Sequence, residues 1–284
     1  MKIQSIIRKS AISLFVFSAL IMVGGYWGHN FKLLLAILCY AFFTYYFISN
    51  AKSKTEKRLV VLILILPPLI YIPIHIFNFK STLISLPSSS AHFMGIAMGL
   101  ILSNLYGKIK YILGTMFIIM TFWLTFIGYP KWINKINYNT FSGHVSYKVP
   151  HPFSCRDQLK NHINNDNLRG KIVLLDFWNT KCGVCFEKFP LLQKLFTKYQ
   201  NNQNVMIYAL DAPLISDSLN EAFLMIEQRK YTFNVLMPDD IHLPERFGVL
   251  SYPTTIVIDR SGNIVFKGDI EQAASALDHL LFYN

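Results

Sequence analysis

Acidic side chains are scarce in this 284-residue sequence, and its first half has almost none. Residues 1–131 contain twelve lysines and arginines but a single acid, Glu56, whereas residues 132–284 contain fifteen basic and fifteen acidic residues. The net charge of +11 therefore comes entirely from the first half, where the basic residues lie between apolar runs. Nucleic-acid-binding domains instead gather their basic residues on one folded face. The distribution argues against a nucleic-acid partner.

Cysteine is also rare, with four residues in the whole sequence. No second cysteine pair and no cysteine–histidine pair has the spacing that would complete a four-ligand zinc site, so we expect no metal. One pair, Cys182 and Cys185, lies within the stretch IVLLDFWNTKCGVCFEKFP, residues 172–190. This stretch has the pattern of a short apolar strand, a turn and the start of a helix. Because the N-terminus of a helix favours a thiolate, Cys182 is predicted to be the nucleophile and Cys185 the resolving thiol.

Charged residues make up only 15% of the sequence and apolar residues 52%, which is too apolar for one soluble globule. Five apolar runs approach the length of about 20 residues that a helix needs to cross a bilayer. They predict a helical transmembrane domain over residues 1–130, embedded in the lipid bilayer. The five predicted spans are residues 11–27, 33–49, 59–77, 91–106 and 111–128.

Proline and glycine occur at informative places in these spans. Pro67, Pro68 and Pro73 predict a kink in the third span, which a helix bundle tolerates. Gly95 and Gly99 have the small-xxx-small spacing that allows the fourth span to pack closely on a neighbour. No A-x-A-like cleavage site follows the first run, so we expect that run to be a span rather than a cleaved signal peptide.

The basic residues between the spans predict their orientation, because cytoplasmic loops carry an excess of lysine and arginine. The N-terminal segment and the second–third and fourth–fifth loops contain nine such residues, while the alternate loops hold only Lys32 and Lys80. This alternation predicts a multi-pass protein of the bacterial inner (plasma) membrane, with a cytoplasmic N-terminus and an extracytoplasmic, periplasmic C-terminal half. If the third or the fourth run did not cross the membrane, the C-terminal half would lie in the cytosol instead.

Polar residues within membrane segments are the first place to look for function. His75 lies near the outer end of the third span and His92 near the outer start of the fourth, so that the two side chains could face each other. A quinone, haem or metal site is one interpretation; plain interfacial histidines are the other, favoured because no third ligand is apparent. Cys39 is the only cysteine within a span, which argues against thiol exchange across the membrane.

After the fifth span the composition changes to asparagine, lysine, tyrosine and glycine, which suggests a linker over residues 131–143. Residues 144–284 then alternate strand-like apolar runs with helical patterns. Such alternation predicts an α/β fold with a central mixed sheet and helices on both faces. The principal expected strands are residues 172–178, 205–211, 233–237, 254–259 and 263–267, and the helices are residues 182–199, 216–230 and 273–282.

Two segments carry a family resemblance: FWNTKCGVC, which precedes a predicted helix, and ERFGVLSYPTTIVIDRSGNIVFKG. Together they resemble the thioredoxin fold, and more specifically the TlpA/ResA-like membrane-anchored thioredoxins, over residues 144–284. The resemblance implies thiol–disulfide exchange by Cys182 and Cys185, with their redox-active disulfide and no other cofactor. It does not extend to the membrane half.

The resemblance also implies roles for residues around this pair. Pro253 matches a proline that is cis in this fold and lies beside the disulfide, and Tyr252 precedes it, where the backbone can pair with an incoming peptide. Asp176 matches an acid that serves the second cysteine as general acid/base, which assigns it to deprotonating Cys185 through water. The alternative is a structural Asp176 that pairs with Lys171 or another cation.

The sequence departs from the family pattern at two positions. Lys181 replaces the usual tryptophan before the first cysteine, and a cation there is expected to stabilise the Cys182 thiolate. Lys188 replaces a glutamate three residues after the second cysteine, and Glu187, one residue earlier, points about 100° away around a helix. The predicted substrate-contacting residues are Tyr252, Pro253, Trp178 and Lys181.

The implied function is that of a membrane-anchored thiol-disulfide oxidoreductase of the protein disulfide reductase type. Its substrates would be disulfides of extracytoplasmic proteins, such as apocytochrome c or other exported proteins that contain thiols. A separate redox partner would reduce its own disulfide again after each reaction. Cys155 is expected to be a free and inert thiol, with exchange with Cys182 as the alternative.

Two other functions remain open. A peroxiredoxin-like peroxidase uses the same fold, but it needs threonine three residues before the reactive cysteine, and Thr180 lies two before Cys182. A non-catalytic sensor or binding module, coupled to the membrane bundle, would hold Cys182 and Cys185 in a structural disulfide.

Overall fold

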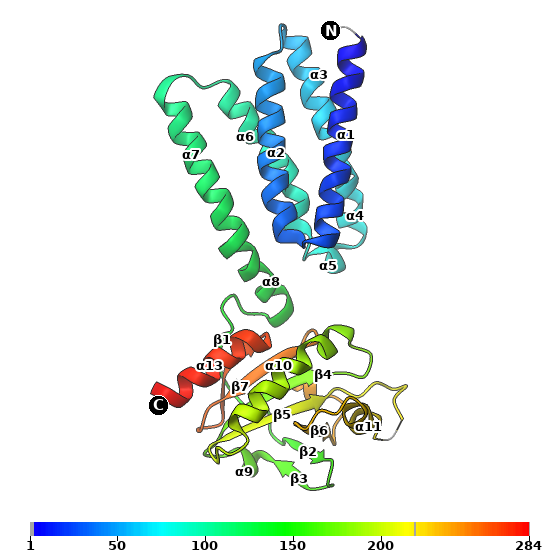
Figure 1. Ribbon diagram of the computed structural model, residues 1–284, viewed down its shortest axis with the longest axis vertical. Helices are drawn as coiled ribbons and strands as arrows, with labels where there is room; N and C mark the ends of the chain where they lie inside the picture. The colour runs from blue at the N-terminus through cyan, green and yellow to red at the C-terminus, as the bar shows by residue number, and fades with distance from the viewer. Residues whose placement is uncertain (1–2, 219, 284) are drawn as a thin grey trace. The chain divides into compact units, whose positions relative to one another are not determined.

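The computed structural model describes residues 3–218 and 220–283. The chain divides into two compact units, one that ends at Ile133 and one that begins at Asn134. The first unit is helical, and the second is built on one sheet (Figure 1).

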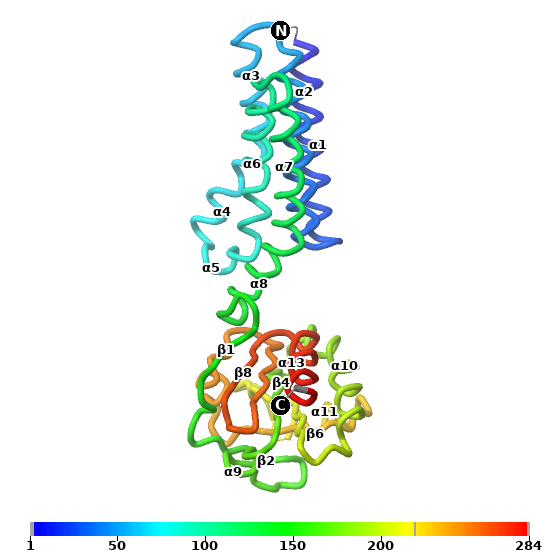
Figure 2. Tube along the Cα trace, turned by 90° about the vertical axis from the view of Figure 1, so that its left-hand side faces the viewer, coloured from blue at the N-terminus to red at the C-terminus, as the bar shows by residue number. Residues whose placement is uncertain are grey.

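Helices long and apolar enough to cross a membrane make up most of the first unit. Among the described residues four qualify by themselves, and a bent pair, α3 with the segment 67–77, gives a fifth if it counts as one span. The axes of the long helices lie roughly parallel to one another within the unit, and the chain reverses direction from α1 to α2 (Figure 2). The helices are α1 (Ile3–Tyr26), α2 (His29–Ser49), α3 (Lys54–Ile65), a 3-10 turn (Pro67–Ile70), α4 (Tyr71–Phe77), α5 (Phe79–Thr82), α6 (Leu86–Ser103), α7 (Gly107–Trp123), a π-helical turn (Leu124–Gly128) and α8 (Tyr129–Tyr138).

The predicted third span is interrupted at its prolines. Helix α3 ends at Ile65, the 3-10 turn starts at Pro67, and α4 continues after a bend of 40°. Two consecutive prolines remove two backbone N–H donors and their rings clash with the preceding turn, which ends the regular helix. Lys32, counted in the sequence as a loop residue, instead lies in the first turn of α2 and is buried.

Glycines bring α2 and α6 into close contact. An added Cβ atom at Gly95 would lie 2.6 Å from the carbonyl oxygen of Ile37, and one at Gly99 would lie 2.5 Å from Cβ of Thr44. Only a residue without a side chain allows the two backbones to approach so closely. The predicted close packing of this span is therefore present, and α2 is its partner.

The second unit contains one eight-stranded mixed sheet in the order β1-β8-β7-β4-β5-β6-β2-β3. Strands β4, β5 and β6 are parallel, β7 pairs antiparallel with β4, and β8 pairs antiparallel with β7. The strands are β1 (His144–Lys148), β2 (Ser154–Asp157), β3 (His162–Asn164), β4 (Ile172–Trp178), β5 (Val205–Asp211), β6 (Asn234–Pro238), β7 (Thr254–Ile258) and β8 (Asn263–Gly268).

Helices cover both faces of this sheet, as predicted. Side chains of α10 (Gly183–Tyr199), α11 (Glu221–Gln228) and α13 (Ile270–Tyr283) pack in one core cluster, together with alternate residues of β4 and β5. Residues from α9 (Asn165–Leu168) and α12 (Leu243–Arg246) pack in a second cluster on the opposite face. Successive residues of a strand point to opposite faces, so the fully buried β4 contributes to both clusters.

Two expected segments differ in the structure. The predicted helix 216–230 is shorter, because Asn220 adopts a left-handed conformation with φ of 68° and the helix begins only at Glu221. Part of the segment 131–143, interpreted as a linker, is helical, since α8 extends to Tyr138.

Candidate functional site

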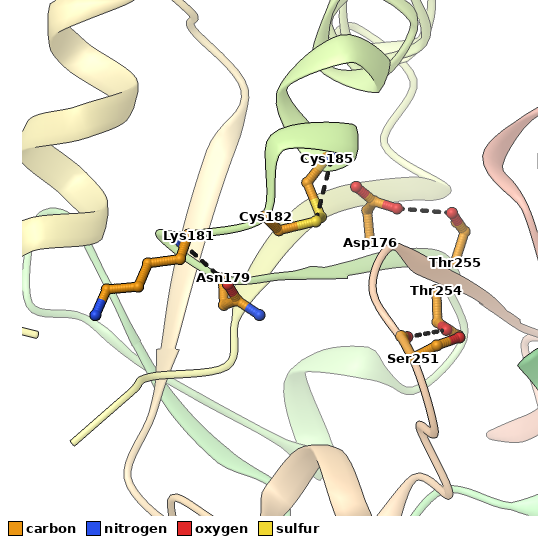
Figure 3. Close-up of a disulfide and its surroundings, with 8 residues drawn as sticks. All are labelled: Asp176, Asn179, Lys181, Cys182, Cys185, Ser251, Thr254 and Thr255. Atoms are coloured by element: carbon orange, nitrogen blue, oxygen red, sulfur yellow. Dashed lines mark hydrogen bonds between the residues drawn. A yellow bond between two sulfur atoms is a disulfide. The ribbon is translucent and has the colours of Figure 1, made fainter. Parts of the chain in front are cut away.

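The two cysteines lie at the junction of β4 and α10. Cys182 is the N-cap residue of α10 and Cys185 lies in its first turn, and a disulfide with an S–S distance of 2.02 Å joins them. Cys182 is partly exposed, whereas Cys185 is completely buried. The backbone N–H of Cys185 donates a hydrogen bond to Sγ of Cys182 over 3.2 Å (Figure 3). The same N–H would stabilise a Cys182 thiolate after reduction.

The turn before the helix is held by Asn179. Its side-chain oxygen accepts a hydrogen bond of 3.1 Å from the backbone N–H of Lys181, and its backbone carbonyl accepts one of 3.1 Å from Cys182. Asparagine often stabilises turns through bonds of this kind to its own backbone neighbours. The strand-to-helix turn is thus determined locally, which explains why it was recognisable in the sequence.

Asp176 is completely buried in β4. It has the same position in the strand alternation as Leu174 and Trp178, which belong to the core cluster of Cys185, so its side chain points to the face that α10 covers. Thr255 of β7, its register partner, donates a hydrogen bond of 2.7 Å to Oδ1 of Asp176. Burial is the main cause that raises the pKa of Asp176 to about 7.

The second carboxylate oxygen of Asp176 remains unsatisfied. Oδ2 is buried and has no hydrogen-bond partner among the described residues. Figure 3 shows Oδ1 turned towards Thr255 and the other oxygen on the side of Cys182 and Cys185. A carboxyl group with a pKa near neutrality and one free oxygen can accept and return a proton at physiological pH. Lys171 bonds the backbone carbonyl of Gln203 instead, and no salt bridge to Asp176 occurs among the described residues.

A charged pair lies near Asp176. Lys188 of α10 forms a salt bridge with Glu271 of α13. Desolvation is the largest cause of the raised pKa of Asp176, and the hydrogen bond from Thr255 lowers that pKa. The negative charge of Glu271 raises it further. Burial also raises the pKa of the neighbouring Asp269, while the positive charge of Lys188 opposes that shift. The lysine that departs from the family pattern is therefore the counter-ion of an acid from another helix.

The segment around Pro253 lies at the same end of the sheet as the cysteines. Phe177 pairs with Thr254 across β4 and β7, so Pro253 precedes β7 at the end of β4 that leads to Cys182. The Tyr252–Pro253 peptide bond is cis, as the resemblance implies. Tyr252 is half-buried and, like Cys182, packs against the core cluster that contains Cys185. Its predicted contact with substrate remains a prediction.

Trp178 cannot serve as predicted, because it is completely buried and no substrate can reach it. Its ring packs against Phe186 and Phe189 of α10, with ring centroids 6.0 and 5.1 Å away. Trp178 therefore belongs to the core cluster that also contains Cys185. The prediction that it contacts the substrate is corrected accordingly.

Lys181 is exposed and precedes Cys182 in the chain, but its ammonium group points away from the two cysteines. Its ammonium group donates a hydrogen bond of 2.7 Å to Oγ of Ser216, and Figure 3 shows the side chain extended away from the disulfide. The observed arrangement therefore does not bring a cation to the sulfur of Cys182, contrary to expectation. Thr180 makes a second bond to the same loop, since it donates to Asp217 over 2.8 Å.

A second buried acid, Asp211, was missed in the sequence. It ends β5, is paired in register with Trp178 and has one carboxylate oxygen that is buried without a partner in the described part of the chain. Burial, followed by the nearby charge of Asp217, raises the pKa of Asp211 to about 7. The signal was available, because Asp211 is the one charged residue of an otherwise apolar strand, as Asp176 is in β4.

The remaining thiol of the second unit is remote from the site. Cys155 is completely buried in β2 and belongs to the core cluster on the opposite face of the sheet from Cys185. Desolvation, and then the charge of Asp239, raises the pKa of this thiol. Cys155 is free in the structure, as expected. No group of three or more metal-binding side chains occurs in residues 3–218 and 220–283.

Comparison with known proteins identifies relatives of the second unit. Residues 145–267 match the AhpC/TSA family. The thiol-disulfide oxidoreductase ResA of Bacillus thuringiensis is 29% identical over 119 residues, which cover 42% of this chain and 66% of that protein. The thioredoxin-like protein YneN of Bacillus subtilis is 27% identical over 139 residues, which cover 49% of this chain and 80% of that protein. The chain thus spans just under two thirds of the length of ResA.

A solved structure is also similar to part of the chain. A putative thiol:disulfide interchange protein DsbE from Chlorobium tepidum is 24% identical, with a TM-score of 0.40 over 48% of this chain and 94% of that one.

Proposed function

The C-terminal half is a thioredoxin-like domain homologous to ResA-type thiol-disulfide oxidoreductases, and from this premise we propose that Cys182 and Cys185 reduce disulfides of extracytoplasmic proteins. The Cys182 thiolate attacks a substrate disulfide, forms a mixed disulfide and releases the first substrate thiolate. Asp176 removes the proton of Cys185 through water, and the Cys185 thiolate then attacks Sγ of Cys182. This second step releases the other substrate thiolate and leaves the Cys182–Cys185 disulfide, so two electrons pass to the substrate.

The observation that carries this proposal is the difference between the two sulfurs. Cys182 is partly exposed and accepts a backbone hydrogen bond, as a nucleophile requires, whereas Cys185 is buried on the face to which Asp176 points. A buried thiol needs a nearby base to ionise, because desolvation disfavours its charged form. The unsatisfied oxygen of Asp176 supplies a suitable base.

We also propose where in the cell the protein lies. We infer that the apolar helices anchor the chain in the bacterial inner membrane in five spans, with α3 and α4 counted as one. The excess of basic residues in alternate loops favours a cytoplasmic N-terminus and an extracytoplasmic thioredoxin-like domain. A separate thiol partner would then recharge Cys182 and Cys185 from the disulfide state.

Variants of the two cysteines test the function in the purified full-length chain. Cys182→Ser should abolish reduction of insulin disulfides, because the attacking thiolate is lost. Cys185→Ser should retain the first step and accumulate a mixed disulfide with the substrate. Cys39→Ser, which removes a thiol outside the site, is the matched control and should keep full activity. Insulin reduction by Cys182→Ser at the original rate would refute the proposal.

Two further assays of the full-length protein distinguish this function from a peroxidase and from a sensor with a structural disulfide. A peroxidase would consume hydrogen peroxide with a thiol reductant, and the hydroxyl of Thr180 is already used in a hydrogen bond to Asp217. A sensor with a structural disulfide would resist reduction, whereas an exchanging pair titrates reversibly against dithiothreitol. We expect no peroxide consumption and a reversible titration.

A further inference from the structure

A second polar site lies inside the helical unit, around Lys32. This side chain is only 5% exposed, yet residues 1–131 contain one acid, Glu56, and that acid bridges Lys9. Lys32 instead donates a hydrogen bond of 2.9 Å to the hydroxyl of Tyr71 and lies 4.4 Å from the centre of its ring. A buried ammonium group without a carboxylate is costly in an apolar helix bundle, which marks the position as functional.

Tyr71 connects Lys32 with two histidines. Its ring centroid is 5.5 Å from that of His92 and 6.4 Å from that of His75. Nε2 of His92 and both ring nitrogens of His75 are buried and have no partner within the described residues. His92 is completely buried and uses its other nitrogen on the backbone of Ser89, 3.0 Å away.

A pocket of about 410 Å³ opens beside this cluster. Tyr71, His75, Ser89 and Ser90 are its lining residues with polar atoms, but its surface is almost entirely apolar, and the ring nitrogens of His75 are buried behind it. Aliphatic and aromatic side chains that include Ile76, Phe79 and Phe93 line the rest. Pockets of this volume, mostly apolar with a few polar groups, are typical of small-molecule sites. The aromatic rings suit a flat ring, and the tyrosine hydroxyl and histidine nitrogens suit oxygen atoms on that ring.

We propose that this pocket binds the head group of a lipid-soluble quinone or quinol. Such a molecule has a flat ring with two oxygens and a tail that is soluble in the membrane. Its oxygens would pair with a nitrogen of His75 and with the Tyr71 hydroxyl, which already accepts a hydrogen bond from Lys32, whereas an acyl chain would leave the nitrogens of His75 without a partner. A metal is not the occupant, since the described residues hold no cluster of three ligands. The proposal concerns binding alone and does not depend on the dithiol of the other unit.

Photolabelling of the full-length chain in lipid nanodiscs tests the proposal. The probe is an azidoquinone with a decyl tail, and the labelled peptides are identified by mass spectrometry. Labelling should fall within residues 71–93, and decylubiquinone should compete at a concentration at least tenfold lower than decylbenzene, which has the same tail and a ring without oxygens. Equal competition by the two compounds would mean an apolar lipid pocket only and would overturn the proposal, as would labelling confined to other helices.

Matched variants test the polar contacts. Tyr71→Phe removes one hydroxyl and should weaken competition by decylubiquinone about tenfold. Tyr111→Phe removes the same hydroxyl from a side chain that is 75% exposed on α7 and should have no effect. His75→Leu should also weaken competition, which keeps the test decisive if Tyr71→Phe does not fold. Unchanged competition in every folded variant at Tyr71 and His75 contradicts the proposal, and the double variant Cys182→Ser, Cys185→Ser should label as the original does.

Discussion

Asp176 and Thr255 face each other across two antiparallel strands, and the threonine hydroxyl donates a 2.7 Å hydrogen bond to one carboxylate oxygen. The bond satisfies half of a completely buried carboxyl group and leaves its other oxygen free on the face of the sheet that carries Cys185. Thr255 therefore positions Asp176 without neutralising it.

The stability of the second unit should fall as the pH rises. Burial raises the pKa of Asp176 from an ordinary value near 4 to about 7 in the folded chain. The folded state then binds the proton more tightly than the unfolded state, so this contribution is complete below about pH 4 and is lost as the pH rises through 7. Between pH 5 and pH 8 the free energy of unfolding should therefore decrease by about 3 kcal/mol from this group alone.

Hydrogen exchange at the amides of β4 and β7, corrected for intrinsic rates, measures this free energy in the full-length chain. Asp176→Asn should flatten the pH dependence, although Asp211 will retain part of it. Asp166→Asn is the matched control, because its side chain is 78% exposed and should leave the curve unchanged. An identical pH dependence in Asp176→Asn would show that this carboxyl group does not titrate as described.

The salt bridge between Lys188 and Glu271 should set the pH at which the enzyme works. Glu271 raises the pKa of Asp176, so Glu271→Gln should lower that pKa and move the midpoint of the pH–rate curve for insulin reduction to lower pH. Lys188→Met leaves Glu271 without its counter-ion and should move the midpoint to higher pH. We expect displacements of about half a pH unit, since both charges are partly exposed. Shifts in the same direction for both variants would contradict this electrostatic account, and Glu227→Gln on exposed α11 serves as control.

Cys155 should be inert in the folded chain. It is completely buried on the face of the sheet opposite Cys185, and its pKa is raised by desolvation, so little thiolate is available. After reduction, N-ethylmaleimide should modify Cys182 first and Cys155 only after denaturation. Mass spectrometry of the alkylated peptides measures this order. Rapid modification of Cys155 in the native chain, or a Cys155–Cys182 disulfide without reductant, would be inconsistent with the structure.

Close packing of α2 on α6 should make Gly99 intolerant of any side chain. An added Cβ atom would lie 2.6 Å from the carbonyl oxygen of Ala41, and backbone atoms cannot move aside easily. Gly99→Ala should therefore destabilise the helical unit by about 1–3 kcal/mol. At Gly25 of α1 an added Cβ atom meets no heavy atom within 4 Å in the described chain, so Gly25→Ala should be harmless. Thermal unfolding of the two variants in detergent compares them, and equal midpoints would disprove the packing argument.

The sequence predicted those parts of the site that depend on local chemistry. The dithiol turn is stabilised by Asn179, three residues before Cys182, and Asp176 is conspicuous as a charge in an apolar strand. The prolines at 67 and 68 break the helix through their own covalent geometry. Each of these features is determined within a few residues of the chain, although the role of Asp176 came from the family resemblance.

The features that the sequence did not reveal all depend on pairing between distant segments. Thr255 is 79 residues from Asp176, and Glu271 is 83 residues from Lys188. No periodicity in the chain indicates which threonine or acid will lie opposite. The prediction that Trp178 contacts the substrate was wrong for a related reason, because the burial of a strand residue depends on the helix that covers it. Lys32 was counted as a loop cation, since its contact with Tyr71 forms only in the assembled bundle.

The central claim is that Cys182 and Cys185 form an exchanging pair outside the cytoplasm. The most direct test is alkylation by a membrane-impermeant maleimide in intact spheroplasts that express the full-length chain, with and without prior dithiothreitol, and with Cys182→Ser as the reference. We predict that Cys182 is modified in unbroken spheroplasts after dithiothreitol and protected by its disulfide after oxidation. Modification that appears only once the membrane is permeabilised, or a pair that never changes its redox state, would contradict the account.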